Sequence, residues 1–309
     1  MTAQLWTRKI LFVSIPVVFV LCLSVNYLTT EIGFGKYLIT IRNVSNYLDT
    51  PITPGSWSFI IWSVIYTWQT LINLFLLASF VIMVAGMRLY EYSFVFSFWF
   101  LGSYLVNFIC NIAWLLIFNF SIYSLNLLPA AVFFILATSI SLYIAIFASY
   151  QGFKNGSDEG FYKDNYLLSL HMRIIVHNGL NAYATWTTVA QFVMFTASLA
   201  YLDKMNINTA SIISLSILLV LILVYGILDL FKWDQYTRYV LTPHFVLVWA
   251  FSGIVWKNNK LGGAVAILSL IILIMAIFML IAKLAITIVR YRKTDEEGYM
   301  EVPDIRRIL

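Results

Sequence analysis

The sequence has very little charge. Only 11% of its 309 residues are Asp, Glu, Lys or Arg, whereas a soluble domain has about 25%. Hydrophobic residues make up 61% of the chain, and its mean hydropathy is +0.87. These values exclude an ordinary soluble protein. They predict an all-α integral membrane protein, because a membrane-spanning helix satisfies its own backbone polar groups.

Residues that hold metals or carry out catalysis are also scarce. The chain has two cysteines and three histidines, and none of them has the spacing of metal ligands. Cys22 and Cys110 lie inside apolar runs, where a free thiol behaves as a small hydrophobic residue. No Ser-His-Asp arrangement lies in a plausible turn, and no glycine-rich phosphate loop follows a strand. We therefore expect no metal site, no catalytic residues and no enzymatic activity.

Among the few charged residues, Lys and Arg outnumber Asp and Glu, and the formal net charge is +5. These residues gather near the ends of the apolar runs and in the C-terminal tail. Basic residues at such positions set the orientation of membrane helices and contact lipid headgroups. We therefore expect the lipid bilayer, and no nucleic acid, as the partner of this charge.

Long apolar runs are what the sequence has in abundance. About 20 residues cross a bilayer, and eight runs approach or exceed that length. Their approximate limits are 10–29, 57–84, 93–119, 126–150, 174–201, 208–230, 239–256 and 262–289. The sequence thus predicts a polytopic helical bundle with about eight transmembrane helices.

An even number of crossings places both termini on one side of the membrane. In this arrangement thirteen Lys and Arg residues lie on the side of the termini and five on the opposite side. Because cytoplasmic loops carry the excess of basic residues, we expect both termini to be cytoplasmic. Lys283 is left out of both counts, because near the end of the last run we expect it to snorkel toward the C-terminal side. The organelle is not predicted.

The first long loop then faces away from the cytoplasm. It holds Asn43-Val44-Ser45, which makes Asn43 a candidate for glycosylation. The longest loop on the opposite side, about 151–173, contains three glycines and mixed charges. That composition is typical of a solvated linker.

The stretch 49–73 combines prolines, a glycine and aromatic residues with an apolar run. Within it Trp62, Tyr66, Gln69 and Asn73 are spaced by four, three and four residues, so a helix places them on one face. An aromatic and polar face is unfavourable against lipid. We therefore expect it to face protein or a ligand.

Two other runs carry a similar face. In the third run, Asn107, Asn111 and Trp114 are spaced by four and three residues. In the fifth run one face holds Gly179, Tyr183, Trp186, Ala190 and Met194, and an adjacent face holds His177, Asn181, Thr188 and Gln191. Three helices with aromatic and amide groups at helical spacing suit an aromatic-walled site for a small molecule.

Plain packing explains the same residues. Amides in membrane helices often bond only to neighbouring helices, each bond contributing about 0.6 kcal/mol, and Trp and Tyr gather at bilayer interfaces. On the residues alone both interpretations stay open.

The remaining ionisable residues suggest structural roles. Asp229 and Asp234 flank Lys232 at the end of a run, which is typical of a solvated boundary. We expect His177 to be a hydrogen-bond partner in the bundle, and His244 to bond backbone groups left unpaired by Pro243. The central parts of the runs contain no carboxylate, which argues against a proton-driven pump.

The stretch around Pro54, Trp62 and Tyr66 resembles the tryptophan-rich sensory protein/translocator protein (TspO/MBR) family. The second helix of that family opens with a Pro-Pro-x-Trp pattern, followed by a tryptophan and, four residues later, a tyrosine. The family's Asn-x-x-Trp in the third helix and Tyr-x-x-Trp-x-x-x-Ala in the fifth match Asn111, Trp114, Tyr183, Trp186 and Ala190. The resemblance covers about residues 10–200.

The chain departs from the family pattern at four positions. Trp57 stands one place later than the first tryptophan of the family, and Thr53 replaces the first proline. Ala182 replaces a proline, and Met194 replaces an asparagine that would donate a hydrogen bond. The chain thus looks like an extended, divergent member whose pocket is reshaped.

The resemblance implies a TspO/MBR-like five-helix bundle over residues 1–203, followed by three additional helices over 204–292 and a charged cytoplasmic tail over 293–309. It also implies that the first loop, from Lys36 to Trp57, caps a cavity, with Pro54 and Gly55 as its hinge. Together with the helical faces, it gives as candidate ligand-binding residues Trp57, Trp62, Tyr66, Gln69, Asn107, Asn111, Trp114, Tyr183, Trp186 and Ala190.

The function implied is that of a membrane sensor, ligand-binding or translocator-like protein for a flat hydrophobic molecule. By resemblance, that molecule is a tetrapyrrole such as a porphyrin or haem, or a sterol; degradation of tetrapyrroles is implied by the family alone. Two alternatives from other classes stay open. One is a transporter or channel with a path through all eight helices, and the other is a structural subunit of a larger membrane complex. A homodimer is compatible with each.

Overall fold

Each of the eight apolar runs corresponds to a helix in the computed structural model, which describes residues 3–29, 40–258 and 262–296. These helices are α1 (Ala3–Tyr27), α3 (Ile61–Ala78), α4 (Phe98–Phe120), α5 (Leu128–Asp158), α8 (Asn178–Ala197), α9 (Ile207–Ile227), α11 (Thr242–Asn258) and α12 (Gly263–Glu296). Most of the described chain is therefore helical, as the composition predicts.

Six helical stretches in the described part of the chain are long and apolar enough to cross a membrane, and they contain α1, α3, α4, α5, α9 and α12. The other two helices are α8, which carries many polar side chains, and α11, which has 17 residues. Both pack within the bundle: α8 contacts α5, α9 and α11, and α11 also contacts α12. The chain is thus an all-α polytopic membrane protein.

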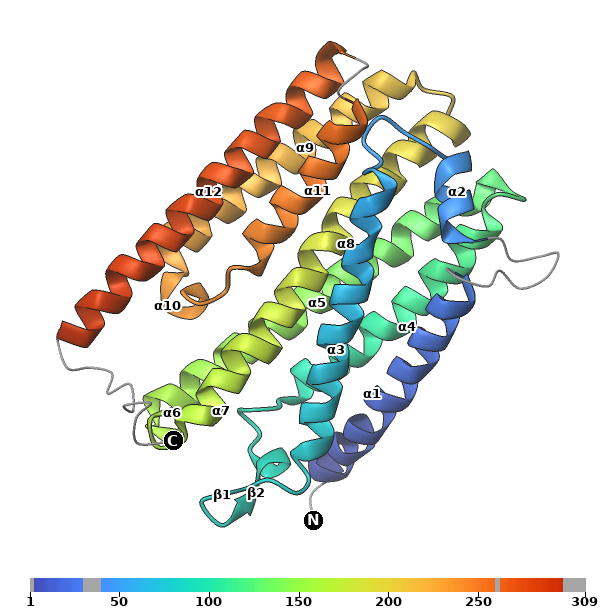
Figure 1. Ribbon diagram of the computed structural model, residues 1–309. Helices are drawn as coiled ribbons and strands as arrows, with labels where there is room; N and C mark the ends of the chain where they lie inside the picture. The colour runs from blue at the N-terminus through green and yellow to red at the C-terminus, as the bar shows by residue number, and fades with distance from the viewer. Residues whose placement is uncertain (1–2, 30–39, 259–261, 297–309) are drawn as a thin grey trace.

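The long helices form three groups (Figure 1). Helices α1, α3 and α4 lie on one side of the bundle, α5 and α8 in the middle, and α9, α11 and α12 on the other side. The start of α1 and the end of α12 lie at the same end of the bundle. That placement agrees with an even number of crossings.

Short elements connect the long helices. A two-stranded hairpin, β1 (Met83–Val84) and β2 (Met87–Arg88), pairs antiparallel with Met83 opposite Arg88. Its turn residues, Ala85 and Gly86, both have positive φ (47° and 82°), as a two-residue hairpin turn of type I′ requires. The apolar run 57–84 therefore does not stay helical to its end, because its last residues form a strand. The remaining short helices are α2 (Ile41–Tyr47), α6 (Phe161–Asp164), α7 (Tyr166–His171) and α10 (Asp234–Thr237).

The prediction of a solvated linker over 151–173 is wrong for its first part, where α5 continues to Asp158. Gly152 is buried, and a Cβ atom added to it would lie 1.8 Å from the carbonyl oxygen of Phe94. A Cβ atom at Gly156 would lie 2.6 Å from the ring of Tyr162. These glycines therefore allow close approach of another segment and do not provide flexibility.

Candidate ligand-binding site

Trp62 of α3 is the centre of an aromatic cluster contributed by three helices. Its ring stacks on Tyr66 and on Trp114 of α4, at centroid distances of 5.6 and 5.8 Å. It also makes edge contacts with Tyr183 and Trp186 of α8, at 6.2 and 6.1 Å. The faces predicted separately for three apolar runs thus meet at one place, as a shared site requires. We call these five residues the aromatic cluster.

A cavity of about 50 Å³ lies against the aromatic cluster. Its wall includes the predicted residues Pro54, Trp62, Trp114, Trp186 and Ala190. Sites for drug-sized molecules enclose about 300–1,000 Å³. The rings would therefore have to separate before a flat molecule could lie between them.

Several residues of the cavity wall were not predicted. Phe118 lies four residues after Trp114, and Val193 lies three residues after Ala190, so each continues a predicted helical face. Helical spacing alone was a sufficient signal for them. Ile41 and Ser45 come from the short helix α2, and no spacing in the sequence connects α2 with the other helices.

Asn111 connects the aromatic cluster to α1. Its side-chain oxygen accepts hydrogen bonds from the Tyr66 hydroxyl and from the Cys22 thiol, each at 3.1 Å. Asn26 in turn donates to the Tyr66 hydroxyl oxygen at 3.1 Å. The contacts fix the position of the Tyr66 ring, and they give Cys22 a polar role that its apolar surroundings in the sequence do not indicate.

The other predicted amides lie outside the cavity wall. Gln69 donates from Nε2 to the carbonyl of Gly179 at 3.0 Å and accepts from the Tyr104 hydroxyl at 2.9 Å. Asn107 donates to the carbonyl of Tyr104 at 2.6 Å, and Asn73 donates to the Tyr104 hydroxyl at 3.3 Å. All three side chains are buried. Gln69 and Asn73 join α3 to neighbouring helices, whereas the hydrogen bond of Asn107 lies within α4.

Four polar groups of the aromatic cluster and Asn111 are buried, and none has a hydrogen-bond partner within the described chain: Asn111 Nδ2, Trp114 Nε1, the Tyr183 hydroxyl and Trp186 Nε1. Among the other candidate residues, the side-chain oxygen of Asn107 is a fifth such group. An unpaired buried polar group costs about 1–3 kcal/mol. Trp114, Tyr183 and Trp186 belong to the aromatic cluster, and Asn111 bonds directly to its member Tyr66. An acceptor atom on a bound molecule would offset this cost.

The hinge residues lie at the boundary between this site and α11. Pro54 lines the cavity, and the backbone N–H of Gly55 donates to the carbonyl of Gly253 at 3.0 Å. Trp57 is 39% exposed and lies against Trp249 of α11, with ring centroids 4.9 Å apart. It is not part of the cavity wall. Of the predicted loop that starts at Lys36, residues 36–39 lie outside the described part of the chain.

Asn43, the glycosylation candidate, is exposed on α2. Use of the sequon stays a prediction. His177 is buried, and its Nε2 lies 3.1 Å from the Ser149 hydroxyl, which confirms its expected role as a hydrogen-bond partner in the bundle.

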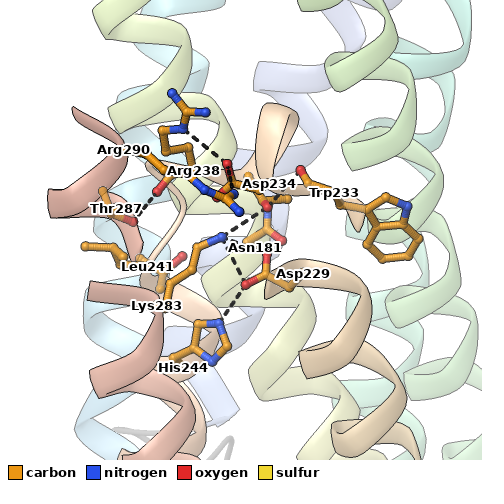
Figure 2. Close-up of polar contacts among 12 residues, drawn as sticks. Asn181, Asp229, Trp233, Asp234, Arg238, Leu241, His244, Lys283, Thr287 and Arg290 are labelled. Carbon is orange, nitrogen blue, oxygen red and sulfur yellow. Dashed lines mark hydrogen bonds and ion pairs between the residues drawn. The ribbon is translucent and has the colours of Figure 1, made fainter. Parts of the chain in front are cut away.

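A second polar cluster, which the sequence did not reveal, lies between α9, α11 and α12 (Figure 2). The expectation that Lys283 snorkels is wrong: its side chain is 0% exposed, and its ammonium group donates to Asp229 and to the Thr237 hydroxyl, each at 3.1 Å. Asp229 is also fully buried and lies 2.9 Å from Nε2 of His244. His244 therefore bonds a carboxylate, and not the backbone groups near Pro243.

Asp234 extends this cluster toward the end of the bundle. It forms ion pairs with Arg238 at 3.2 Å and with Arg290, and its side chain is only 7% exposed. The prediction of a solvated boundary at Asp229 and Asp234 is therefore wrong. A lone Asp and a lone Lys in two apolar helices do suggest a buried pair, but 54 positions separate Asp229 from Lys283, and no spacing rule joins them.

Neither cluster resembles a metal centre. Within the described residues, no group of three or more His, Cys, Asp or Glu side chains is arranged to hold a metal ion.

Comparison with protein families relates most of the chain to a known family. A family model described as TSPO-like protein matches residues 10–285. The match extends beyond the first five long helices and includes α9, α11 and most of α12. No curated protein and no solved structure matches the chain.

Proposed function

Because the chain belongs to the TSPO-like protein family, we propose that it binds a flat hydrophobic molecule at the aromatic cluster and acts as a membrane sensor or translocator-like protein. The observation that carries this proposal is the set of four buried polar groups in and beside the aromatic cluster that have no partner within the described chain; two of them, the indole N–H groups of Trp114 and Trp186, belong to residues of the cavity wall. The ligand classes are a tetrapyrrole, such as a porphyrin or haem, and a sterol-like molecule.

The chemistry of the site supports recognition by stacking. Aromatic pairs contribute about 0.5–1.5 kcal/mol beyond the area they bury. A flat ligand that enters between Trp62 and Trp114 would replace their mutual stacking with two new stacked faces. The indole N–H groups of Trp114 and Trp186 would then donate to an acceptor atom at its edge. The other proposed ligand-binding residues support this wall through the hydrogen bonds of Asn111 and Gln69.

Porphyrin titration of the purified protein tests the proposal. The readout is quenching of tryptophan fluorescence by protoporphyrin, for wild type and for Trp62→Ala, Trp186→Ala and Trp99→Ala. Trp99 is 70% exposed, so its variant removes one fluorophore without touching the site. We expect the apparent Kd to rise at least tenfold in Trp62→Ala and Trp186→Ala and to stay unchanged in Trp99→Ala. Equal titration curves for all three variants would remove the support for the site.

The distribution of basic residues supports cytoplasmic N- and C-termini. We propose this orientation together with insertion as a single polytopic bundle, alone or as a homodimer. A glycosylation reporter fused to either terminus should stay unglycosylated. Native mass analysis after mild detergent extraction distinguishes a monomer or dimer from a subunit of a larger complex.

A transporter or channel is the second candidate, and the buried Asp229, His244 and Lys283 favour it. Ionisable residues within membrane bundles often belong to substrate or ion pathways. The measurement is uptake of a broad substrate panel into liposomes that contain the protein. Lack of uptake for every substrate would argue against this function.

A further inference from the structure

A second, polar chamber of about 220 Å³ adjoins the aromatic cavity. The two spaces share Ser45, Pro54 and Phe59 in their walls. The chamber adds polar and charged side chains that the cavity lacks, among them Asp49 and Lys257. These two side chains form an ion pair and are 46% and 28% exposed. The chamber therefore lies between the surface and the aromatic cavity.

The wall of this chamber is formed by the end of α2, the loop 49–58 and α11. The loop and α11 are about 200 positions apart in the sequence, and hydrogen bonds and an ion pair join them. Gly55 donates to the carbonyl of Gly253 at 3.0 Å, and Trp249 Nε1 donates to the carbonyl of Ser58 at 2.8 Å. Lys257 pairs with Asp49, and Asn258 donates to the carbonyl of Pro51.

Glycine allows the two segments to approach this closely. A Cβ atom added to Gly253 would lie 3.0 Å from the Cβ atom of Ser58 and 3.2 Å from that of Pro54. A Cβ atom added to Gly55 would lie 2.7 Å from the ring of Trp256. The contact is therefore a packed interface along half of α11.

The opposite end of α11 is fixed to the rest of the bundle. His244 bonds the buried Asp229 at 2.9 Å. The side-chain oxygen of Asn178 accepts from the backbone N–H groups of Leu241 and Thr242, at 3.1 and 3.4 Å, where α11 begins. With α11 held in this way, separation of the interface requires movement of the loop 49–58.

We propose that the polar chamber is the entrance to the aromatic cavity and that α11 controls entry by holding the loop 49–58 in the closed position. This inference rests on the proposed function, because it concerns access to that site. The three additional helices thereby gain a role: α11 regulates a site whose aromatic wall comes from the other helices.

A reversible cross-link tests the proposal. The would-be Cβ atom at position 253 and the Cβ atom of Ser58 lie 3.0 Å apart, near the separation of about 3.5–4.5 Å found in disulfides. In the double variant Ser58→Cys, Gly253→Cys, mild oxidation should close the bond and reduction should reopen it. We expect the association and dissociation rates of protoporphyrin to be at least tenfold lower in the oxidised form than in the reduced form. Stopped-flow measurement of tryptophan quenching gives both rates.

The single variants Ser58→Cys and Gly253→Cys serve as controls, since they retain Cys22 and Cys110 but cannot form the cross-link. Their rates should not respond to oxidation. Unchanged rates in the oxidised double variant, with binding retained, would overturn the proposal and place the entrance elsewhere.

Weakening the interface should have the opposite effect. Trp249→Phe removes the hydrogen bond to Ser58. Trp233→Phe is its control, because Trp233 has a similar exposure (39% against 37%) and lies at the start of α10, before α11 begins. Loss of one hydrogen bond of about 1 kcal/mol corresponds to about a fivefold faster opening. Protoporphyrin association should therefore accelerate about fivefold in Trp249→Phe alone.

Hydrogen exchange without any ligand separates this proposal from the proposed function. Peptides that cover residues 49–58 should exchange about fivefold faster in Trp249→Phe than in wild type or in Trp233→Phe. If residues 49–58 exchange at the same rate in all three proteins, the proposal that α11 holds the loop closed is overturned, whatever the result of the porphyrin titration. Faster hydrogen exchange in Trp249→Phe, together with no saturable quenching by protoporphyrin, would support control of the loop by α11 and contradict the proposed ligand.

Discussion

The protein buries two polar clusters, and they differ in charge and in how well their groups are paired. The aromatic cluster and Asn111 are uncharged, and four of their polar groups have no partner within the described chain. The cluster around Asp229 is charged, and its carboxylate and the Lys283 ammonium group bond each other and further side chains. In this cluster Nδ1 of His244 and one carboxylate oxygen of Asp234 have no partner within the described chain, but each of these side chains makes an ion pair or hydrogen bond through its other atom. Neutral unpaired donors cost about 1–3 kcal/mol each, whereas an unpaired buried charge costs several kcal/mol.

This difference explains why the two clusters suit different roles. A site can leave a neutral donor unpaired for a ligand at a lower cost in stability than it can leave a charge unpaired. Buried charges must be paired in the resting protein, and the pairing holds α9, α11 and α12 together. We therefore expect the first cluster to govern binding and the second to govern stability.

Breaking the charged cluster should have the largest effect. Asp229→Ala leaves the fully buried Lys283 without its counter-ion, and such a loss costs about 3–5 kcal/mol. Lys283→Met should cost a similar amount, and the double variant should recover much of the loss because no unpaired charge remains. The measurement is the free energy of unfolding in mixed detergent micelles.

Asp49→Ala is the matched control for this prediction, because Asp49 belongs to a partly exposed ion pair with Lys257. Exposed pairs contribute about 0.2–1 kcal/mol. If Asp229→Ala were as mild as Asp49→Ala, the charged cluster would not be a stability element. If the double variant were stable but substrate uptake were lost, the transport function would gain support.

Asn178→Ala should have the next largest effect, because this side chain joins the two regions that carry the clusters. Its amide donates to the carbonyls of Arg173 and Tyr239, each at 2.8 Å, and its oxygen accepts from two backbone N–H groups at the start of α11. Removing it leaves several partly buried backbone groups without this partner, at a total cost of about 1–3 kcal/mol. Differential scanning fluorimetry should show a lower Tm.

Asn165→Ala is the control for this variant, since the Asn165 amide donates to Phe161 within the same segment. It should leave the Tm nearly unchanged. A split into two unfolding transitions in Asn178→Ala would also support the predicted boundary near residue 203, which no observation so far tests.

The two clusters also differ in how far the sequence predicted them. Trp62, Trp114 and Trp186 were identified because each lies on a polar or aromatic face repeated at helical spacing, and the structure brings these faces together. That argument needs only local periodicity. The wall contributed by α2 was not predicted, because it depends on how a loop folds back over the bundle.

The charged cluster escaped prediction because its order comes from contacts between distant positions. Asp229 looked like a helix-end residue next to Lys232, but it lies in a π-helical segment, Leu228–Lys232, that continues α9, and its side chain bonds Lys283 of α12. Gly152 was misjudged for a similar reason, since its close partner Phe94 lies on another segment. Composition and spacing thus predict the helices and one face of each, whereas the closest contacts depend on tertiary packing.

The smallest effects are expected for two tyrosine hydroxyl groups, those of Tyr104 and Tyr183, which differ in their hydrogen-bond partners. The Tyr104 hydroxyl donates to Gln69 at 2.9 Å and accepts from Asn73 at 3.3 Å, whereas the Tyr183 hydroxyl has no partner within the described chain. Tyr104→Phe should therefore cost about 1 kcal/mol of unfolding free energy, and Tyr183→Phe less than about 0.5 kcal/mol. The order should reverse for binding, because only the Tyr183 hydroxyl is free to bond a ligand. We expect protoporphyrin titration to show about a fivefold weaker Kd for Tyr183→Phe and no change for Tyr104→Phe. If the two variants had equal effects on stability and on binding, the presence or absence of a hydrogen-bond partner would not distinguish a structural hydroxyl from a ligand-binding one in this site.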